Sequence, residues 1–213
     1  MKKIFTIIAV AFISVTGFSQ AFKFGTITAQ SGVGIGIYGI RAYSPINQTE
    51  HSGIGFVGTL PAVEAEFGVA KFLGIGGRFR RGTYGKSAGN KLRGNDLMLR
   101  LNFHVANSND NFDLGIGAGY GLSTFGGDIS DTEYLRTKGS VLNIHVTPHL
   151  YFGKYVGMFL SVGYNKHMLN KNIEMKDSGG KVWTNADGAT WNMGGLYFEF
   201  GVAGRFDLFK KGE

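Results

Sequence analysis

Histidines and acidic residues are the side chains of this sequence that could bind a metal or transfer protons. His145 and His149 are four residues apart in a segment with a strand-like period, which separates them by roughly 13 Å, too far to share one metal ion. Asp128, Asp131 and Glu133 lie close together, but their spacing does not fit the twelve-residue calcium loop. We therefore expect no metal, no catalytic residue and no enzymatic activity, and we interpret the acidic cluster as a solvated loop.

A glycine pattern raises the separate question of a nucleotide. The run from Gly34 to Gly39 fits the G-x-G-x-x-G pattern of dinucleotide-binding sites. That motif needs a helix directly after the glycines, whereas this chain continues to Pro45 without a helical period. We therefore expect no cofactor. Glycines on the inner wall of a narrow barrel would instead leave space for long side chains from the opposite wall.

The elements that would position these side chains are strands, because apolar and polar or small residues alternate with a period of two along most of the chain. Most of the alternating segments are about as long as a tilted strand that crosses a bilayer, which needs roughly 9–11 residues. We count eight such segments: Ser31–Arg41, Val57–Val69, Leu73–Arg81, Asn95–Ala106, Phe112–Ser123, Val141–Tyr151, Tyr155–Asn165 and Met193–Leu208.

The connections between these segments alternate in length. Three are short, namely Ala70–Phe72, Asn107–Asp110 and Phe152–Lys154. Four are long, namely Ala42–Phe56, Gly82–Gly94, Thr124–Ser140 and Lys166–Asn192. Short periplasmic turns and long extracellular loops are typical of outer-membrane barrels. The sequence therefore predicts an all-β fold, an eight-stranded antiparallel up-and-down transmembrane β-barrel, integral to a bacterial outer membrane, with both termini on the periplasmic side.

The first residues have the features of an export signal. Lys2 and Lys3 precede the apolar run Ile4–Val15, and Gly17 and Ser19 are small residues suited to cleavage. The run is too short for a spanning helix, which needs about 20 residues. We predict a cleaved signal peptide over residues 1–19 and an outer-membrane β-barrel domain over residues 20–213. Nucleic acid is not an expected partner, because an exported protein rarely meets it, even though the formal net charge is +7.

Charged side chains of the predicted strands share one face, opposite the large apolar residues. An Arg or Lys that faced lipid at the bilayer midplane would cost about 2–4 kcal/mol, so we assign this face to the interior. The predicted lumen charge network is Glu64, Glu66, Arg78, Arg80, Arg100, His104, Asp113, Glu199 and Arg205, and His145, His149 and Asp207 share its face. An eight-stranded barrel is only wide enough for side chains to fill it, so we expect a lumen closed by ion pairs.

The faces also predict which residues lie opposite one another in neighbouring strands, because a slip by one residue would turn charges towards lipid. We place Arg100 inside, near Gly117 of the fifth segment. The expected opposite pairs are Glu64 with Arg78, His104 with Asp113, and His145 with Ser161.

Two of the long connections contain residues that could meet an external partner. Arg81, Lys86, Lys91 and Arg93 form a basic stretch without an acidic residue, which would suit the phosphates of an outer-leaflet glycolipid. The alternative is a solvated basic rim. The longest connection contains Trp183, and Trp is frequent at binding hot spots. The alternative for Trp183 is a side chain folded onto the barrel rim.

With these features the chain resembles the small outer-membrane β-barrel proteins of the OmpA/OmpX-like class, and in particular the glycine-rich versions of Bacteroidetes-type bacteria. The resemblance covers nearly all of the chain after the signal peptide. It rests on the opening Phe22–Gly25, the eight alternating segments and the closing Gly201–Phe209. The closing segment resembles the aromatic final strand that the barrel-assembly machinery recognises, except that four residues follow the last Phe.

These features together predict a monomer with a structural or surface-interaction role through its extracellular loops. Its expected partners are outer-membrane lipid and lipopolysaccharide, the barrel-assembly machinery during insertion, and an extracellular ligand that the sequence does not name. A small diffusion channel and a lipid-modifying outer-membrane enzyme are the alternatives. A soluble lipocalin-like barrel is a more distant one, and it would place apolar residues such as Leu97 and Leu99 inside.

Overall fold

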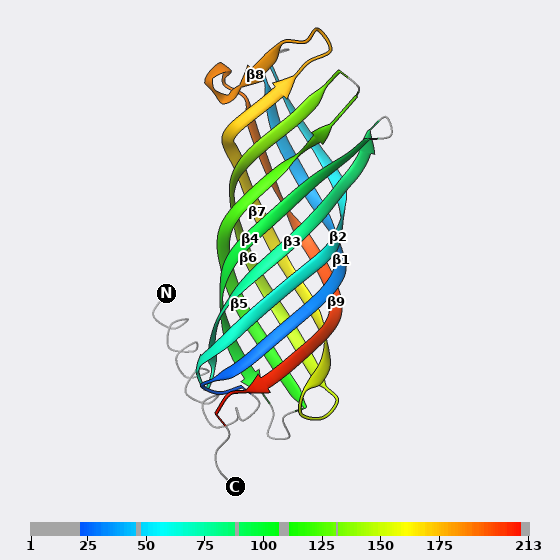
Figure 1. Cartoon of the computed structure of the whole chain (residues 1–213). Helices are drawn as coiled ribbons and strands as arrows, with labels where there is room; N and C mark the ends of the chain where they lie inside the picture. The colour runs from blue at the N-terminus through cyan, green and yellow to red at the C-terminus, as the bar shows by residue number, and fades with distance from the viewer. Residues whose placement is uncertain (1–21, 46–47, 88–89, 107–110, 131, 210–213) are drawn as a thin grey trace, which may run out of the picture.

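The computed structural model describes residues 22–45, 48–87, 90–106, 111–130 and 132–209, so the predicted signal peptide lies outside the described residues. Eight long antiparallel strands form one closed ring (Figure 1), in the order β1-β2-β3-β4-β5-β6-β7-β9, with β9 paired back to β1. Their bounds are β1 Thr26–Ser44, β2 Thr49–Ala70, β3 Leu73–Ser87, β4 Asn90–Ala106, β5 Phe112–Asp128, β6 Tyr134–Tyr151, β7 Val156–Lys176 and β9 Thr190–Asp207.

A smaller element lies at one end of the ring. Strand β8 (Val182–Thr184) pairs with the end of β7, and the 3₁₀ helix η1 (Asn185–Asp187) leads from it towards β9. In Figure 1 this tip stands at the end opposite to the start of β1 and the end of β9. None of the helices in the described part of the chain is long and apolar enough to cross a membrane.

The strands are longer than the alternating segments predicted, and the connections at the β8 end are correspondingly shorter. The four predicted long loops are therefore wrong in extent, because β1 continues to Ser44, β3 to Ser87, β5 to Asp128 and β7 to Lys176. The backbone of these extensions remains paired across each hairpin, which satisfies its N–H and C=O groups. The closed ring ends earlier than the strands do, because β2 pairs with β3 only up to Val57 and Tyr84, and the extensions above that level are paired hairpins.

The two faces of the wall have opposite character along the middle of the barrel. Outward residues there are large, apolar and exposed, such as Leu99 at 74% and Phe200 at 62%. Inward residues are mainly glycines and buried polar or charged side chains, with a few apolar ones such as Met98 and Phe159, which is the reverse of a soluble barrel. Leu97, Leu99 and Leu101 point outward and are exposed, so the lipocalin-like alternative does not hold.

Towards the β8 end this polarity inverts. The inner face carries a buried cluster, here called the apolar layer, formed by Tyr38, Val57, Tyr84, Phe125, Leu135, Leu169 and Met193. The outer face of the same region carries exposed basic residues such as Arg41, Arg81 and Arg136. Where the outer face is basic, the upper wall is therefore built like a water-soluble barrel, whereas on β2 the outward Ile54 and Phe56 remain apolar and exposed. The apolar layer is not part of the interior that the sequence predicted.

Candidate functional site

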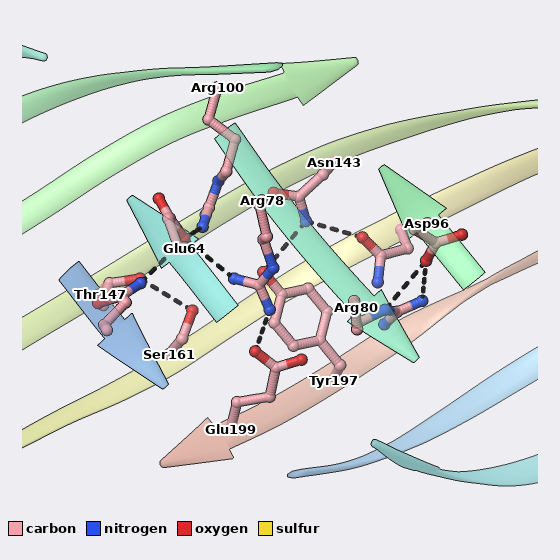
Figure 2. A network of polar contacts seen from close by, with 12 residues as sticks. Glu64, Arg78, Arg80, Asp96, Arg100, Asn143, Thr147, Ser161, Tyr197 and Glu199 are labelled. Carbon is pink, nitrogen blue, oxygen red and sulfur yellow. Dashed lines mark hydrogen bonds and ion pairs between the residues drawn. The ribbon is translucent and has the colours of Figure 1, made fainter. Parts of the chain in front are cut away.

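The centre of the lumen is a cluster of buried ion pairs, here called the charged layer (Figure 2). Glu64 of β2 pairs with Arg100 of β4 and with Arg78 of β3, at 3.4 Å between Oε2 and the Arg78 Nη1. Arg78 also pairs with Glu199 of β9, which is fully buried. Glu64 also accepts a hydrogen bond from Gln30 at 2.9 Å. Two arginines and two carboxylates from four strands therefore bind one another across the tube.

Glycines opposite the long side chains make this crossing possible. Arg100 lies between Gly76 of β3 and Gly119 of β5, and Glu199 lies opposite Gly34 of β1. A Cβ atom at Gly119 would lie 2.9 Å from the Arg100 Cγ, closer than real Cβ contacts. The glycine-rich face of the sequence therefore supplies the volume that the charged face occupies.

A second group of ion pairs marks the upper boundary of the charged layer. Arg80 donates to the Asp96 carboxylate from Nε at 3.0 Å and from Nη2 at 2.6 Å, and to the Tyr38 hydroxyl at 2.7 Å. Ser123 and His167 also contact Asp96, at 2.7 Å and 3.2 Å. Asp96 was missed in the predicted network, although it shares a segment and a face with Arg100, and this parity could have identified it.

The lower end of the lumen is organised around His104. Its Nε2 lies 2.7 Å from the Glu66 Oε1, and its Nδ1 lies 2.7 Å from the Asp113 Oδ2. Contacts from both ring nitrogens to carboxylates suit the imidazolium form, in which both nitrogens donate. The ring of Phe22 stacks on His104 at 3.7 Å between centroids. His149 follows, with its Nε2 at 2.8 Å from the Gln30 Oε1.

Amide and hydroxyl groups extend the upper group of ion pairs along the tube, because they hydrogen-bond to the same Tyr38 hydroxyl as Arg80. Asn143 donates to Asn165 at 2.8 Å and to the Tyr197 hydroxyl at 3.1 Å, and Asn165 donates to the Tyr38 hydroxyl at 2.7 Å. On the neighbouring wall, Thr147 and Ser161 hydrogen-bond to each other at 2.8 Å. Of these residues only Ser161 was predicted to face the interior, because uncharged polar residues on an inner face give no distinctive pattern.

The structure places the predicted network residues as follows. Glu64, Glu66, Arg78, Arg80, Arg100, His104, Asp113, Glu199 and Arg205 are all buried in the lumen, as are His145 and His149. Arg205 lies over the ring of Tyr151 at 4.3 Å. The placement of Asp207 inside is wrong. Asp207 is exposed where β9 ends and pairs with Lys23 at 2.9 Å, because the wall no longer surrounds a side chain at its last residue.

The residues predicted to meet external partners lie at the other end. Arg81 and Arg93 point outward from β3 and β4 and are exposed. Lys86 and Lys91 pair at the tip of the same hairpin, so they lie in strands and not in a loop; their side chains are outside the described part of the structure. Trp183 lies in β8, where its indole donates to Asp177 at 2.9 Å and the Lys181 ammonium lies 3.6 Å from the ring centroid. Trp183 is therefore packed within its own hairpin and not against the barrel rim.

The closed ring of eight strands, the apolar outer band and the charged interior define an integral outer-membrane β-barrel, which confirms the predicted fold class. No known family model matches the chain, and no curated protein matches it by sequence.

Solved structures with the same fold come from small outer-membrane barrels. OprG of Pseudomonas aeruginosa is 10% identical with a TM-score of 0.53, covering 87% of this chain and 98% of that one. AlkL, solved in lipid bilayers, is 11% identical with a TM-score of 0.53, covering 90% and 95%. Neisserial surface protein A is 15% identical with a TM-score of 0.50, covering 85% and 97%. These similarities support the general class and not the narrower Bacteroidetes glycine-rich family.

Proposed function

We propose that this protein is an outer-membrane barrel with a closed lumen that acts through its extracellular end, as a structural or surface-interaction protein. The observation that carries the proposal is the filling of the lumen at two levels. The charged layer crosses the tube through Arg78 and Arg100 with Glu64 and Glu199, and the apolar layer occupies the tube above it. An eight-stranded ring leaves little more room than such side chains need.

The first test is electrical, since the main alternative is a small diffusion channel. The purified barrel, reconstituted in planar bilayers at 1 M KCl, is expected to give no discrete single-channel steps. The double variant Arg100→Ala with Glu64→Ala removes one ion pair from the charged layer. If this variant gives channel openings, the recording is able to detect a conducting lumen, so the variant serves as the positive control. Regular unitary steps from the parent protein would contradict the closed lumen and favour the channel.

The proposal places the β8 end outside the cell and the start of β1 and the end of β9 on the periplasmic side. Strands β2, β4 and β6 end, and β3, β5 and β7 begin, at the latter end, which is where the short periplasmic turns of outer-membrane barrels lie. A cysteine introduced in place of Ser178 is therefore expected to react with a membrane-impermeant maleimide on whole cells, because it lies in the connection between β7 and β8. Labelling only after lysis would show that the β8 end faces the periplasm, which is the opposite of the proposed orientation.

The proposal further includes export by the signal peptide, insertion by the barrel-assembly machinery and a monomeric state in the membrane. It assigns no catalytic step. The rival role of lipid modification is tested by mass spectrometry of lipid A from a deletion strain, in which the acylation pattern is expected to equal that of the parent strain. A changed pattern that the plasmid-borne protein restores would support the enzyme instead.

A further inference from the structure

The outer face of the barrel changes from apolar to basic at one level of strands β3 to β6. On β4, the exposed outward residues Leu99 and Leu97 are followed by Asn95 and Arg93. On β6, the outward Leu142 and Ser140 are followed by Lys138 and Arg136, which are both exposed. Arg81 on β3 is exposed at the same side of the wall. Basic side chains thus project outward directly above the surface that lipid covers.

Strand register brings residues of the four strands β3 to β6 together in one row. Arg81 lies opposite Asn95, Asn95 opposite Thr124, and Thr124 opposite Lys138. In the neighbouring row, Gly126 of β5 lies between Arg93 of β4 and Arg136 of β6. Since adjacent strands are about 4.8 Å apart, the two arginines start about 10 Å apart on either side of a residue without a side chain.

A groove of about 570 Å³ follows this arrangement, here called the basic groove, with Arg93, Asn95, Thr124, Gly126, Arg136 and Lys138 among its lining residues. The acidic residue among the described lining is Glu174, which accepts a hydrogen bond from Tyr134 at 2.5 Å. Arg136 stacks over the Tyr134 ring at 4.8 Å. The ion pairs found in the described part of the chain involve none of Arg93, Arg136 and Lys138. The groove therefore keeps a net positive charge available to a ligand.

We propose that the basic groove binds the phosphate groups of a glycolipid of the outer leaflet. Arginines match phosphate oxygens with two parallel N–H donors, and Asn95 and Thr124 add uncharged donors between them. Leu97 and Leu122, exposed at 60% and 68%, lie in the next outward row and offer a surface to acyl chains. A soluble sulfated polysaccharide would share the charge but would gain nothing from these leucines.

The inference rests on the proposed extracellular placement of the β8 end. It also changes the set of residues that form the glycolipid contact. Arg81 and Arg93 belong to the basic stretch that the sequence suggested. Arg136 and Lys138 come from a different segment, and only the pairing of β5 with both β4 and β6 places them beside Arg93. The proposed site is thus a groove on the outer wall and not a basic loop.

The test compares glycolipid binding by the refolded barrel and by two double variants. Arg93→Gln with Arg136→Gln removes both arginines beside Gly126, and the matched control Arg41→Gln with Lys166→Gln removes two exposed outward cations elsewhere on the wall. Lipid A carrying both phosphates is titrated into the barrel in nanodiscs of zwitterionic lipid and bound lipid is counted by native mass spectrometry. Loss of two basic contacts is expected to weaken binding about 30-fold, at roughly fivefold per residue near an anionic headgroup.

The result that supports the proposal is a weaker affinity of the groove variant alone, together with little binding of dephosphorylated lipid A by the parent. Equal affinity of parent and groove variant would overturn it, as would equal loss in both double variants. If the groove variant loses heparin binding but keeps lipid A, the ligand is a soluble polyanion instead. Heat-modified gel migration reports whether each sample is folded. Failure of the parent protein to insert into the lipid would contradict the proposed membrane role itself, and this outcome is distinct from failure of the groove to bind lipid A.

Discussion

At the scale of single residues, the interior is a set of complementary volumes. Arg100 lies between Gly76 and Gly119, and Glu199 lies opposite Gly34, whereas Glu64 and Arg78 lie opposite each other. Taking such charges out of water is favourable only where partners and geometry compensate for the lost hydration. Glu64 is the clearest case, because two arginines and Gln30 bind the same carboxylate.

Removal of Glu64 is therefore expected to destabilise the barrel strongly. Glu64→Ala leaves Arg100 without its carboxylate partner and Arg78 with Glu199 alone, and the loss of one member of a buried pair typically costs about 3–5 kcal/mol. The measurement is the urea midpoint of the folded form in micelles, read from gel migration. Glu50→Gln, at an exposed site on β2, is the control and should change stability by less than about 0.5 kcal/mol. Equal midpoints for both variants would show that the pair contributes little.

At the scale of the elements, the sequence predicted which face of each strand points inward better than it predicted which residues of neighbouring strands lie opposite each other. The pair Glu64 with Arg78 is confirmed, whereas His104 lies opposite Gly115 and His145 opposite Gly163, each two residues from the expected partner. Alternation repeats every two residues, so it excludes a slip by one and leaves a slip by two undetected. The turns fix that choice, for example through Gly153 between β6 and β7, whose φ of +89° favours glycine.

The strand ends were missed for a related reason. In β7 the outward residues change from Tyr164 to Lys166, while the inward residues change from Asn165 to Leu169 and Ile173. The alternation therefore continues with reversed polarity where the wall leaves the lipid, and a reversal within a few residues looks like the end of a strand. The membrane band was predictable from the sequence, and the tube above it was not.

The observed register gives a sharper test of the filled lumen. Gly117 lies opposite Asn102 and not Arg100, and a Cβ atom there would lie 2.6 Å from the His145 Cε1. Gly117→Leu is expected to destabilise the barrel by about 1–3 kcal/mol through overpacking. Gly77→Leu, at an outward site with open space around it, should leave the unfolding midpoint almost unchanged. A larger loss of stability in Gly77→Leu than in Gly117→Leu would contradict the assignment of the inner face.

The β7–β8 hairpin should respond to acid. The hydrogen bond from the Trp183 indole, together with those from the backbone of Lys181 and Gly179, lowers the pKa of Asp177 below its usual value. A lowered pKa means that the contact stabilises the hairpin above about pH 4 and is lost as the pH falls through the lowered value. Trp183 fluorescence in a Trp191→Phe background should therefore change below about pH 4. Asp177→Asn should abolish that transition, and a transition that persists in this variant would assign it to another group.

At the scale of the whole molecule, the barrel is a tube much taller than a membrane requires. The 22 residues of β2 correspond to about 70 Å of strand, or roughly 55 Å of height at a tilt near 40°, compared with an apolar band of about 25 Å. Figure 1 shows the hairpins of the tilted strands ending at different heights, with the tip that carries β8 standing above the others. The apolar layer gives the upper tube a core of its own, so it does not depend on lipid.

Removal of the tip should therefore separate folding from surface interaction. Replacement of residues 177–189 by a shorter flexible Gly/Ser linker, long enough to join Lys176 to Thr190, removes β8 and η1 but keeps the eight strands of the ring. The shortened protein is expected to keep its gel shift and its thermal midpoint within a few degrees, while binding of expressing cells to immobilised host or matrix ligands falls. Loss of folding would show that the tip stabilises the ring, and unchanged binding to every surface would move the contact to another hairpin.

The continued pairing of the strands above the apolar band also sets the thermodynamics of any contact made there. Segments that order only on binding lose conformational entropy at that moment, which weakens the complex for a given area. Hairpins that are already paired, with Trp183 held by Asp177, have undergone that loss during folding. A partner would therefore meet a preorganised surface, and mutations that loosen the hairpins would weaken binding without touching the partner.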